Sequence, residues 1–123
     1  MNSFNFKKWN NIIGWFAFAI ALFTYASTIE PTVSYWDCGE YIPTAVKLEV
    51  GHPPGAPLFQ MLGAFFAMFS SKATEFAKMV NLMSALSSAL TILFMFWTIT
   101  TLAKRLVAKK EIFSTSTGIA ILG

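Results

Sequence analysis

The sequence predicts an all-α membrane protein in which two transmembrane helices flank a loop outside the cytoplasm. Of its 123 residues, 55% are hydrophobic and only 12% are charged, and the mean hydropathy is +0.57. Two apolar runs, 12–29 and 81–103, contain no charged residue. A transmembrane helix needs about 20 predominantly apolar residues. The composition therefore argues against a soluble globular domain.

The first span is expected at residues 12–29. At about 1.5 Å per residue this run covers roughly 27 Å, close to the thickness of a bilayer core. Trp9 and Trp15 lie near its start and Tyr25 lies near its end. Aromatic residues at these positions are typical of the two membrane–water interfaces.

A cleaved signal peptide is the alternative for the same run, because Lys7 and Lys8 precede it. The chain would then yield a secreted peptide. The run is longer than a usual signal sequence, and Ala26-Ser27-Thr28 is only a weak cleavage site. We therefore favour the span.

The second span is expected at residues 81–103. The shorter run Leu58–Phe69 suits an interfacial or re-entrant helix, since it is too short to cross a bilayer comfortably. If it does not cross, the basic clusters before the first span and after the second both face the cytoplasm, as the positive-inside rule prefers. Residues 30–78 then form one extracytoplasmic loop. This loop contains five acids (Glu30, Asp37, Glu40, Glu49 and Glu75) and three lysines (Lys47, Lys72 and Lys78).

The loop is expected to carry two short helices along the membrane surface. The first runs from about Tyr41 to Val50, with Pro43 in its first turn, where the missing N–H costs little. Gly51 is expected to end it. A stiff turn, His52–Pro57, then leads into the second helix, because proline fixes the backbone φ angle.

A new apolar run begins at about residue 112 and stops at Gly123. We therefore expect residues 1–123 to be the N-terminal part of a polytopic membrane domain that ends in a truncated third span. This piece should be inactive alone.

The net charge of +3 does not indicate nucleic acid binding, because most basic residues lie at the ends of apolar runs and form no stripe. The single cysteine, Cys38, excludes an internal disulfide and any multi-cysteine metal site. No neighbouring base marks it as a nucleophile.

Two acids near the start of the first short helix are the leading catalytic candidates. Asp37 and Glu40 are three residues apart, which is also the spacing of a structural capping box. Asp37 lies eight residues beyond the first span, close to the lipid headgroups. A carboxylate there can act as general base on a substrate hydroxyl that lies within hydrogen-bond reach.

Four further residues are candidates for substrate binding. His52 can bind a phosphate oxygen or carry a proton, and is otherwise a structural turn residue. Trp36 and Tyr41 can stack on a sugar or serve as interfacial anchors. Lys47 can bind a lipid phosphate, pair with Glu40 or Glu49, or stay solvated. Asp37, Glu40 and His52 offer ligand types for a divalent cation, although their spacing requires no metal.

The segments Pro31–Tyr41 and Leu48–Leu58 carry a resemblance to a known family. The acidic motif Trp36-Asp37-Cys38-Gly39-Glu40-Tyr41 and the motif Gly51-His52-Pro53-Pro54-Gly55 resemble the start of the domain of unknown function 2723, also called glycosyltransferase family 117, of Bacteroidetes-type bacteria. More distantly, the chain is similar to C-type glycosyltransferases such as the protein O-mannosyltransferases. It departs from their adjacent Asp-Glu pair, because Cys38 and Gly39 separate the two acids.

The resemblance implies a multi-pass enzyme of the bacterial inner membrane with the N-terminal part of a C-type glycosyltransferase fold. Such an enzyme transfers a sugar, mannose among the candidates, with inversion from a polyprenyl-phosphate donor. The acceptor is a protein Ser/Thr or another hydroxyl on the extracytoplasmic side. Asp37 matches the catalytic acid, Glu40 the second acid, and His52 the residue ahead of Pro-Pro in the donor region.

A non-enzymatic membrane scaffold or a transporter segment is the alternative function. Transporters usually keep functional ionisable residues inside their spans. Neither predicted span contains any, and the serines of the second span suit helix packing. This weighs against transport.

Overall fold

The computed structural model describes residues 5–34, 36–52 and 55–122, with side chains described as far as residue 108. Over these residues the chain is all-helical, which confirms the predicted class. The elements in order are α1 (Phe6–Ser27), α2 (Cys38–Lys47), α3 (Pro57–Ala67), the 3-10 helix η1 (Ala73–Glu75) and α4 (Phe76–Leu122).

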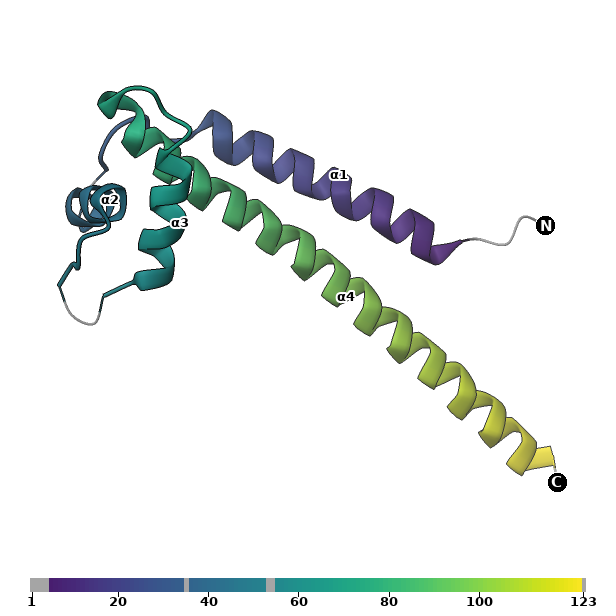
Figure 1. The fold of residues 1–123 in the computed structure, drawn as a ribbon. Coiled ribbons are helices and arrows are strands. Elements are labelled where there is room, and N and C mark those ends of the chain that lie inside the picture. The colour runs from purple at the N-terminus through teal and green to yellow at the C-terminus, as the bar shows by residue number, and fades with distance from the viewer. Residues whose placement is uncertain (1–4, 35, 53–54, 123) are drawn as a thin grey trace.

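Helices α1 and α4 form a long antiparallel pair, and α2 and α3 lie together at one end of it (Figure 1). Helix α1 begins six residues before the predicted apolar run. Its start is fixed by Asn5, whose side chain accepts a hydrogen bond from the Lys8 backbone N–H at 3.1 Å. It ends where the Thr28 backbone N–H donates to Thr24 O at 3.2 Å.

A glycine allows α1 and α4 to approach closely. Gly14 is buried, and a Cβ atom added there would lie 2.5 Å from Nε1 of Trp97 on α4. Trp97 also packs edge-to-face against Trp15 of α1, with ring centroids 6.1 Å apart. The bulky indole therefore occupies the space that a side chain at position 14 would need.

Both long helices have the length and composition of a membrane span. The most apolar 18-residue stretch has a mean hydropathy of 1.2 within Phe6–Ser27 and of 1.8 within Ala73–Ala108. Large apolar side chains on both helices are exposed, among them Phe16, Phe23 and Phe94. These features confirm two helices apolar and long enough to cross a bilayer.

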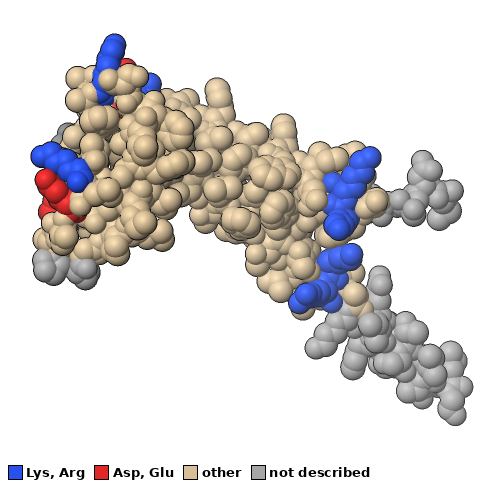
Figure 2. Space-filling view, in the orientation of Figure 1, with Lys and Arg blue, Asp and Glu red and all other residues tan. Residues whose placement is uncertain are grey.

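Charged side chains lie at the two ends of the helix pair. In Figure 2, lysine and arginine side chains cluster at the end where the two termini lie, and acids and further lysines lie at the other end. The ammonium group of Lys104 on α4 lies 4.5 Å from the centroid of the Phe6 ring at the start of α1. The apolar middle is therefore bounded by charge on both sides.

The first short helix differs from its predicted position. It begins at Cys38 and ends at Lys47, so that Pro43 lies inside the helix and not in its first turn. The predicted stop at Gly51 is also wrong. Leu48 ends the helix in a left-handed conformation, with φ 54° and ψ 40°, and the Glu49 backbone N–H returns to Thr44 O at 2.9 Å.

A small hydrophobic core joins α2 and α3 to the start of α4. Ile42, Ala77, Val80 and Met83 are buried in it, and Cys38, Val46, Phe59 and Phe66 pack around them. Helices α2 and α3 approach closely at a glycine: a Cβ atom added to Gly63 would lie 2.8 Å from the Cβ atom of the fully buried Ala45. This core fixes the start of α2 relative to α4.

Helix α4 runs without a break through the stretch in which a third span is predicted to begin. Residues 104–111 contain neither proline nor glycine, so nothing in the local sequence interrupts the helix. Where α4 would leave and re-enter a membrane stays a prediction.

Candidate functional site

The candidate acid Asp37 lies at the start of α2 and is exposed. Its backbone oxygen accepts hydrogen bonds from the N–H groups of Glu40 and Tyr41, at 3.0 and 2.9 Å, but its carboxylate makes no capping bond. The capping-box interpretation is therefore wrong for this structure. The preceding residue, Trp36, has a positive φ of 66° and a side chain that is 92% exposed.

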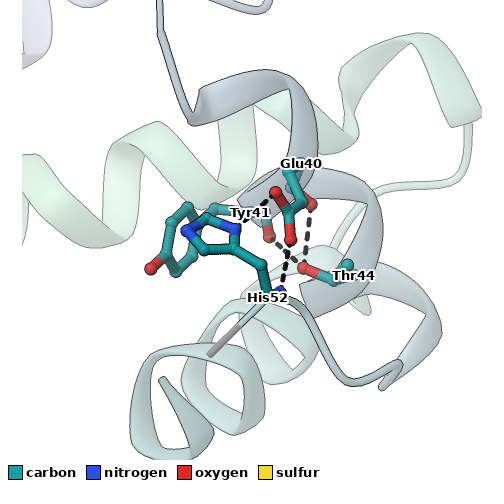
Figure 3. Close-up of polar contacts among 4 residues, drawn as sticks. All are labelled: Glu40, Tyr41, Thr44 and His52. Carbon is teal, nitrogen blue, oxygen red and sulfur yellow. Dashed lines mark hydrogen bonds and ion pairs between the residues drawn. The ribbon is translucent and has the colours of Figure 1, made fainter. Parts of the chain in front are cut away.

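Glu40 binds His52 with both of its carboxylate oxygens (Figure 3). Oε1 accepts a hydrogen bond from the His52 backbone N–H at 2.7 Å, and Oε2 lies 2.7 Å from Nδ1 of the imidazole ring. The two residues are twelve positions apart in the sequence. This paired contact ties the loop after α2 back onto the first turn of that helix.

Two glycines shape the loop that carries His52. A Cβ atom at Gly51 would lie 2.9 Å from Oε1 of Glu40, so any larger residue there would make the carboxylate shift. Gly55 has a φ of 75°, and its N–H donates to His52 O at 3.0 Å. The predicted rigid turn lies partly outside the described residues, which omit Pro53 and Pro54.

The contact with His52 lowers the pKa of the Glu40 carboxyl below its usual value of 4.5. The main cause is the hydrogen bond from the His52 backbone N–H, followed by the bond from the ring. Partial desolvation opposes both, because it disfavours the charged form. Glu40 is therefore a carboxylate at neutral pH, although its side chain stays partly exposed.

Tyr41 joins this pair to α3. Its ring meets the His52 ring edge-to-face at 6.2 Å and the Phe59 ring edge-to-face at 5.6 Å. Lys47 lies apart from the group. Its ammonium is 3.9 Å from Oε1 of Glu49, with both side chains well exposed, and it lines a different apolar pocket that includes Pro43 and Val46.

A pocket of about 470 Å³ opens beside Asp37, between the starts of α2 and α3 and one face of α4. Its lining residues are Trp36, Asp37, Cys38, Tyr41, Ile42, Ala56, Phe59, Val80, Asn81 and Ser84. Asp37 supplies the carboxylate of this lining. The pocket therefore combines one potential base with mostly apolar and aromatic walls, as small-molecule sites commonly do.

Asn81 is a pocket residue that the sequence analysis did not single out. Its Nδ2 atom donates to Glu30 O at 2.9 Å and to Thr32 O at 3.2 Å. The side chain thereby holds the segment that connects α1 to α2 against α4. Its position as a polar residue at the start of the second apolar run was the available signal.

Within the described part of the chain, no three His, Cys, Asp or Glu side chains gather in a way that would hold a metal ion. The described contacts of Glu40 and His52 are with each other and with neighbouring aromatic and backbone groups. We therefore derive no chemistry through a cation.

Comparison with known proteins identifies the family. Residues 37–123 match the family described as the protein O-mannosyl-transferase TMEM260 N-terminal domain. The chain belongs to this family. It is also 36% identical, over 76 residues, to the protein O-mannosyl-transferase tmem260 of Dictyostelium discoideum. No solved structure matches the chain.

The TMEM260 N-terminal domain match begins at Asp37 and includes Glu40, His52 and Asn81. This confirms the predicted kinship with O-mannosyltransferases, while the assignment to glycosyltransferase family 117 stays a prediction. The aligned stretch is 61% of this chain but only 9% of the Dictyostelium protein. The chain therefore spans less than a tenth of the length of that curated relative.

Proposed function

We propose that this chain is the N-terminal part of a membrane O-mannosyltransferase that moves a sugar from a polyprenyl-phosphate donor to a protein hydroxyl. The TMEM260 family match supports this reaction class. The observation that carries the proposal is the pocket of about 470 Å³ that has Asp37 in its wall. It lies at the end of two helices that are apolar enough to span a bilayer, where a lipid-linked donor would be presented.

Asp37 is the general base in this proposal. Its carboxylate is exposed to the pocket and is not used to cap α2, whereas both oxygens of Glu40 contact His52. Asp37 takes the proton of the acceptor hydroxyl as the oxygen attacks the anomeric carbon. The bond from that carbon to the phosphate oxygen breaks, and the lipid phosphate leaves with the electron pair. The sugar is transferred with inversion, as in C-type glycosyltransferases.

His52 is assigned to the donor phosphate. Glu40 occupies Nδ1 of the ring, and Nε2 remains to donate a hydrogen bond when the ring carries a proton there. Charge developing on the leaving phosphate needs such a donor. Trp36 and Tyr41 are in the wall of the pocket beside Asp37 and provide aromatic faces for the sugar. His52 does not line that pocket itself but lies next to it, against the ring of Tyr41. Lys47, which lies in another pocket, receives no role.

The pocket is assigned to the extracytoplasmic side. Lys104 on α4 lies against the ring of Phe6, next to Lys7 and Lys8 at the start of α1. Figure 2 shows lysine and arginine side chains gathered at this end of the apolar helix pair, and the positive-inside rule places such an end in the cytoplasm. Helix α3 then lies at the outer surface. Its exposed side chains Leu58, Met61 and Phe65 are apolar, which suits the boundary between headgroups and acyl chains. In a bacterium this membrane is the inner membrane.

The test is Asp37→Asn in the full-length protein, assayed with a polyprenyl-phosphate mannose donor and a serine- or threonine-containing acceptor. Loss of a general base lowers kcat by about 10²- to 10⁴-fold. Glu49→Gln is the matched control, because it removes an exposed acid of the same loop that pairs only with Lys47 among the described side chains. Normal transfer by Asp37→Asn, with normal expression, would exclude Asp37 as the base.

A further inference from the structure

We infer that Glu40 is a positioning residue that acts through His52 and is not a second catalytic base. The inference rests on the proposed function, because it assigns a role to the second acid of the same site. Glu40 is the acid closest in sequence to the base Asp37. It would contribute to donor binding only by holding His52 in place.

The first argument is that the carboxylate of Glu40 is already engaged. Each oxygen has its own partner on His52, at 2.7 Å in both cases. To accept a proton from a substrate hydroxyl, Glu40 would have to release one of these bonds. Asp37 faces the pocket without any such bond. The two acids of the motif therefore have different roles.

The second argument is that the surroundings of Glu40 are built around this contact. Glycine at position 51 leaves Oε1 undisturbed, whereas a Cβ atom there would lie 2.9 Å from that oxygen and make the carboxylate shift. On the far side, Nε2 of Gln60 would lie 3.7 Å from the same Cβ position. A larger residue at position 51 would therefore move the carboxylate from its present contact with His52.

The third argument concerns which ring nitrogen of His52 is left after the contact with Glu40. A carboxylate at Nδ1 requires that this nitrogen carry a hydrogen. The ring is restrained, because Nδ1 is bound to the Glu40 carboxylate and the ring packs edge-to-face with that of Tyr41. Glu40 and Tyr41 are the titratable side chains that contact the ring within the described residues. Nε2 is therefore the nitrogen that, in the doubly protonated ring, can donate a hydrogen bond to the phosphate of the sugar donor.

The experiment is a double-mutant cycle in the full-length enzyme, with Glu40→Gln, His52→Ala and the two combined. Michaelis constants are measured separately for the polyprenyl-phosphate mannose donor and for the acceptor. Glu40→Gln is expected to raise the donor KM by about three- to tenfold, the usual effect of losing a partly exposed hydrogen bond to a charged group. The acceptor KM should not change. In the His52→Ala background the same substitution should add nothing further.

The alternatives give different results. If Glu40 were itself a base, Glu40→Gln would lower kcat by about 100-fold or more, and its effect would add to that of His52→Ala. If Glu40 merely supported the fold, Glu40→Gln would raise the KM for the donor and the KM for the acceptor together. Glu40→Asp, which keeps the carboxylate, would then not bring the donor KM alone back toward the wild-type value. Either pattern, or an unchanged donor KM in Glu40→Gln, overturns the inference.

Failure of this inference is distinguishable from failure of the proposed function. Asp37→Asn reports on the transfer reaction alone, because Asp37 makes no contact with His52 among the described interactions. An inactive Asp37→Asn enzyme together with additive effects of Glu40 and His52 would reject only the positioning role. An active Asp37→Asn enzyme would reject the proposed base whatever Glu40 does.

Discussion

Replacing Gly63 with alanine is expected to destabilise the protein, although alanine is normally the better helix former. In an exposed helix interior, Gly→Ala stabilises by about 1 kcal/mol. At position 63, however, the new Cβ atom would lie 2.8 Å from the Cβ atom of Ala45, and Ala45 is fully buried. Neither group can rotate away, because both are the first atoms of their side chains.

The size of the effect follows from the displacement that is needed. Ordinary contacts between such atoms begin at 3.4 Å, so α2 and α3 must separate by at least about 0.6 Å, which is the kind of overpacking that costs about 1–3 kcal/mol. After the gain in helix propensity is subtracted, Gly63→Ala should be less stable than the wild type by about 1 kcal/mol. Transfer activity should also fall, because α2 carries the residues of the site.

The assay is the melting temperature of the full-length protein in detergent, and Gly39→Ala is the matched control. Gly39 lies in α2, and a Cβ atom there would meet nothing within 4 Å. This variant should therefore be as stable as the wild type or slightly more so. Equal melting temperatures for the two variants would refute the tight approach of α2 and α3 at Gly63.

Three further predictions follow from the same structure. Leu48→Gly should stabilise the protein by about 1 kcal/mol and raise its melting temperature, because Leu48 is 64% exposed and adopts a φ of 54° that favours glycine. The control is Val50→Gly, at a 92% exposed position without a positive φ, which should not raise the melting temperature. Asn81→Leu should lower stability by about 1–2 kcal/mol and make residues 28–34 more sensitive to proteolysis, since two hydrogen bonds to the backbone are lost; unchanged cleavage would count against this anchor. Because the pKa of Glu40 is below 4.5 in the folded state, the stabilisation it contributes is complete above about pH 4.5 and is lost as the pH falls through the lowered pKa. The melting temperatures of the wild type and Glu40→Gln should therefore differ at pH 7 and converge in stronger acid. A difference that stays constant with pH would argue against the contact between Glu40 and His52.

The helices of this chain could be predicted from local sequence, but their ends could not. The uncharged runs indicated α1 and α4, since length and hydropathy are sufficient signals for apolar helices. The start of α2 was placed three residues late because Pro43 was assigned to a first turn. Its end was assigned to Gly51, whereas backbone hydrogen bonds end the helix at Leu48, in a conformation that a leucine rarely adopts.

The residues of the candidate site could be predicted from the sequence, but the contacts between them could not. Asp37, Glu40 and His52 stood out as rare ionisable residues in an apolar chain. The capping box paired Glu40 with Asp37, three residues before it, yet the partner of Glu40 in the structure is His52, twelve residues after it. That contact depends on how the loop folds back onto α2, and no periodicity or propensity encodes it. Asn81 was passed over because its hydrogen-bond partners lie some fifty residues earlier in the chain.

The unbroken course of α4 has a mechanical consequence. Its first turns contribute Val80, Asn81 and Ser84 to the pocket wall, and the same helix continues to Leu122. At about 1.5 Å per residue this is a rod of roughly 70 Å. A tilt or axial rotation imposed at its far end would move one wall of the pocket relative to Asp37. The pocket beside Asp37 and the far end of α4 are thus joined by a single continuous helix.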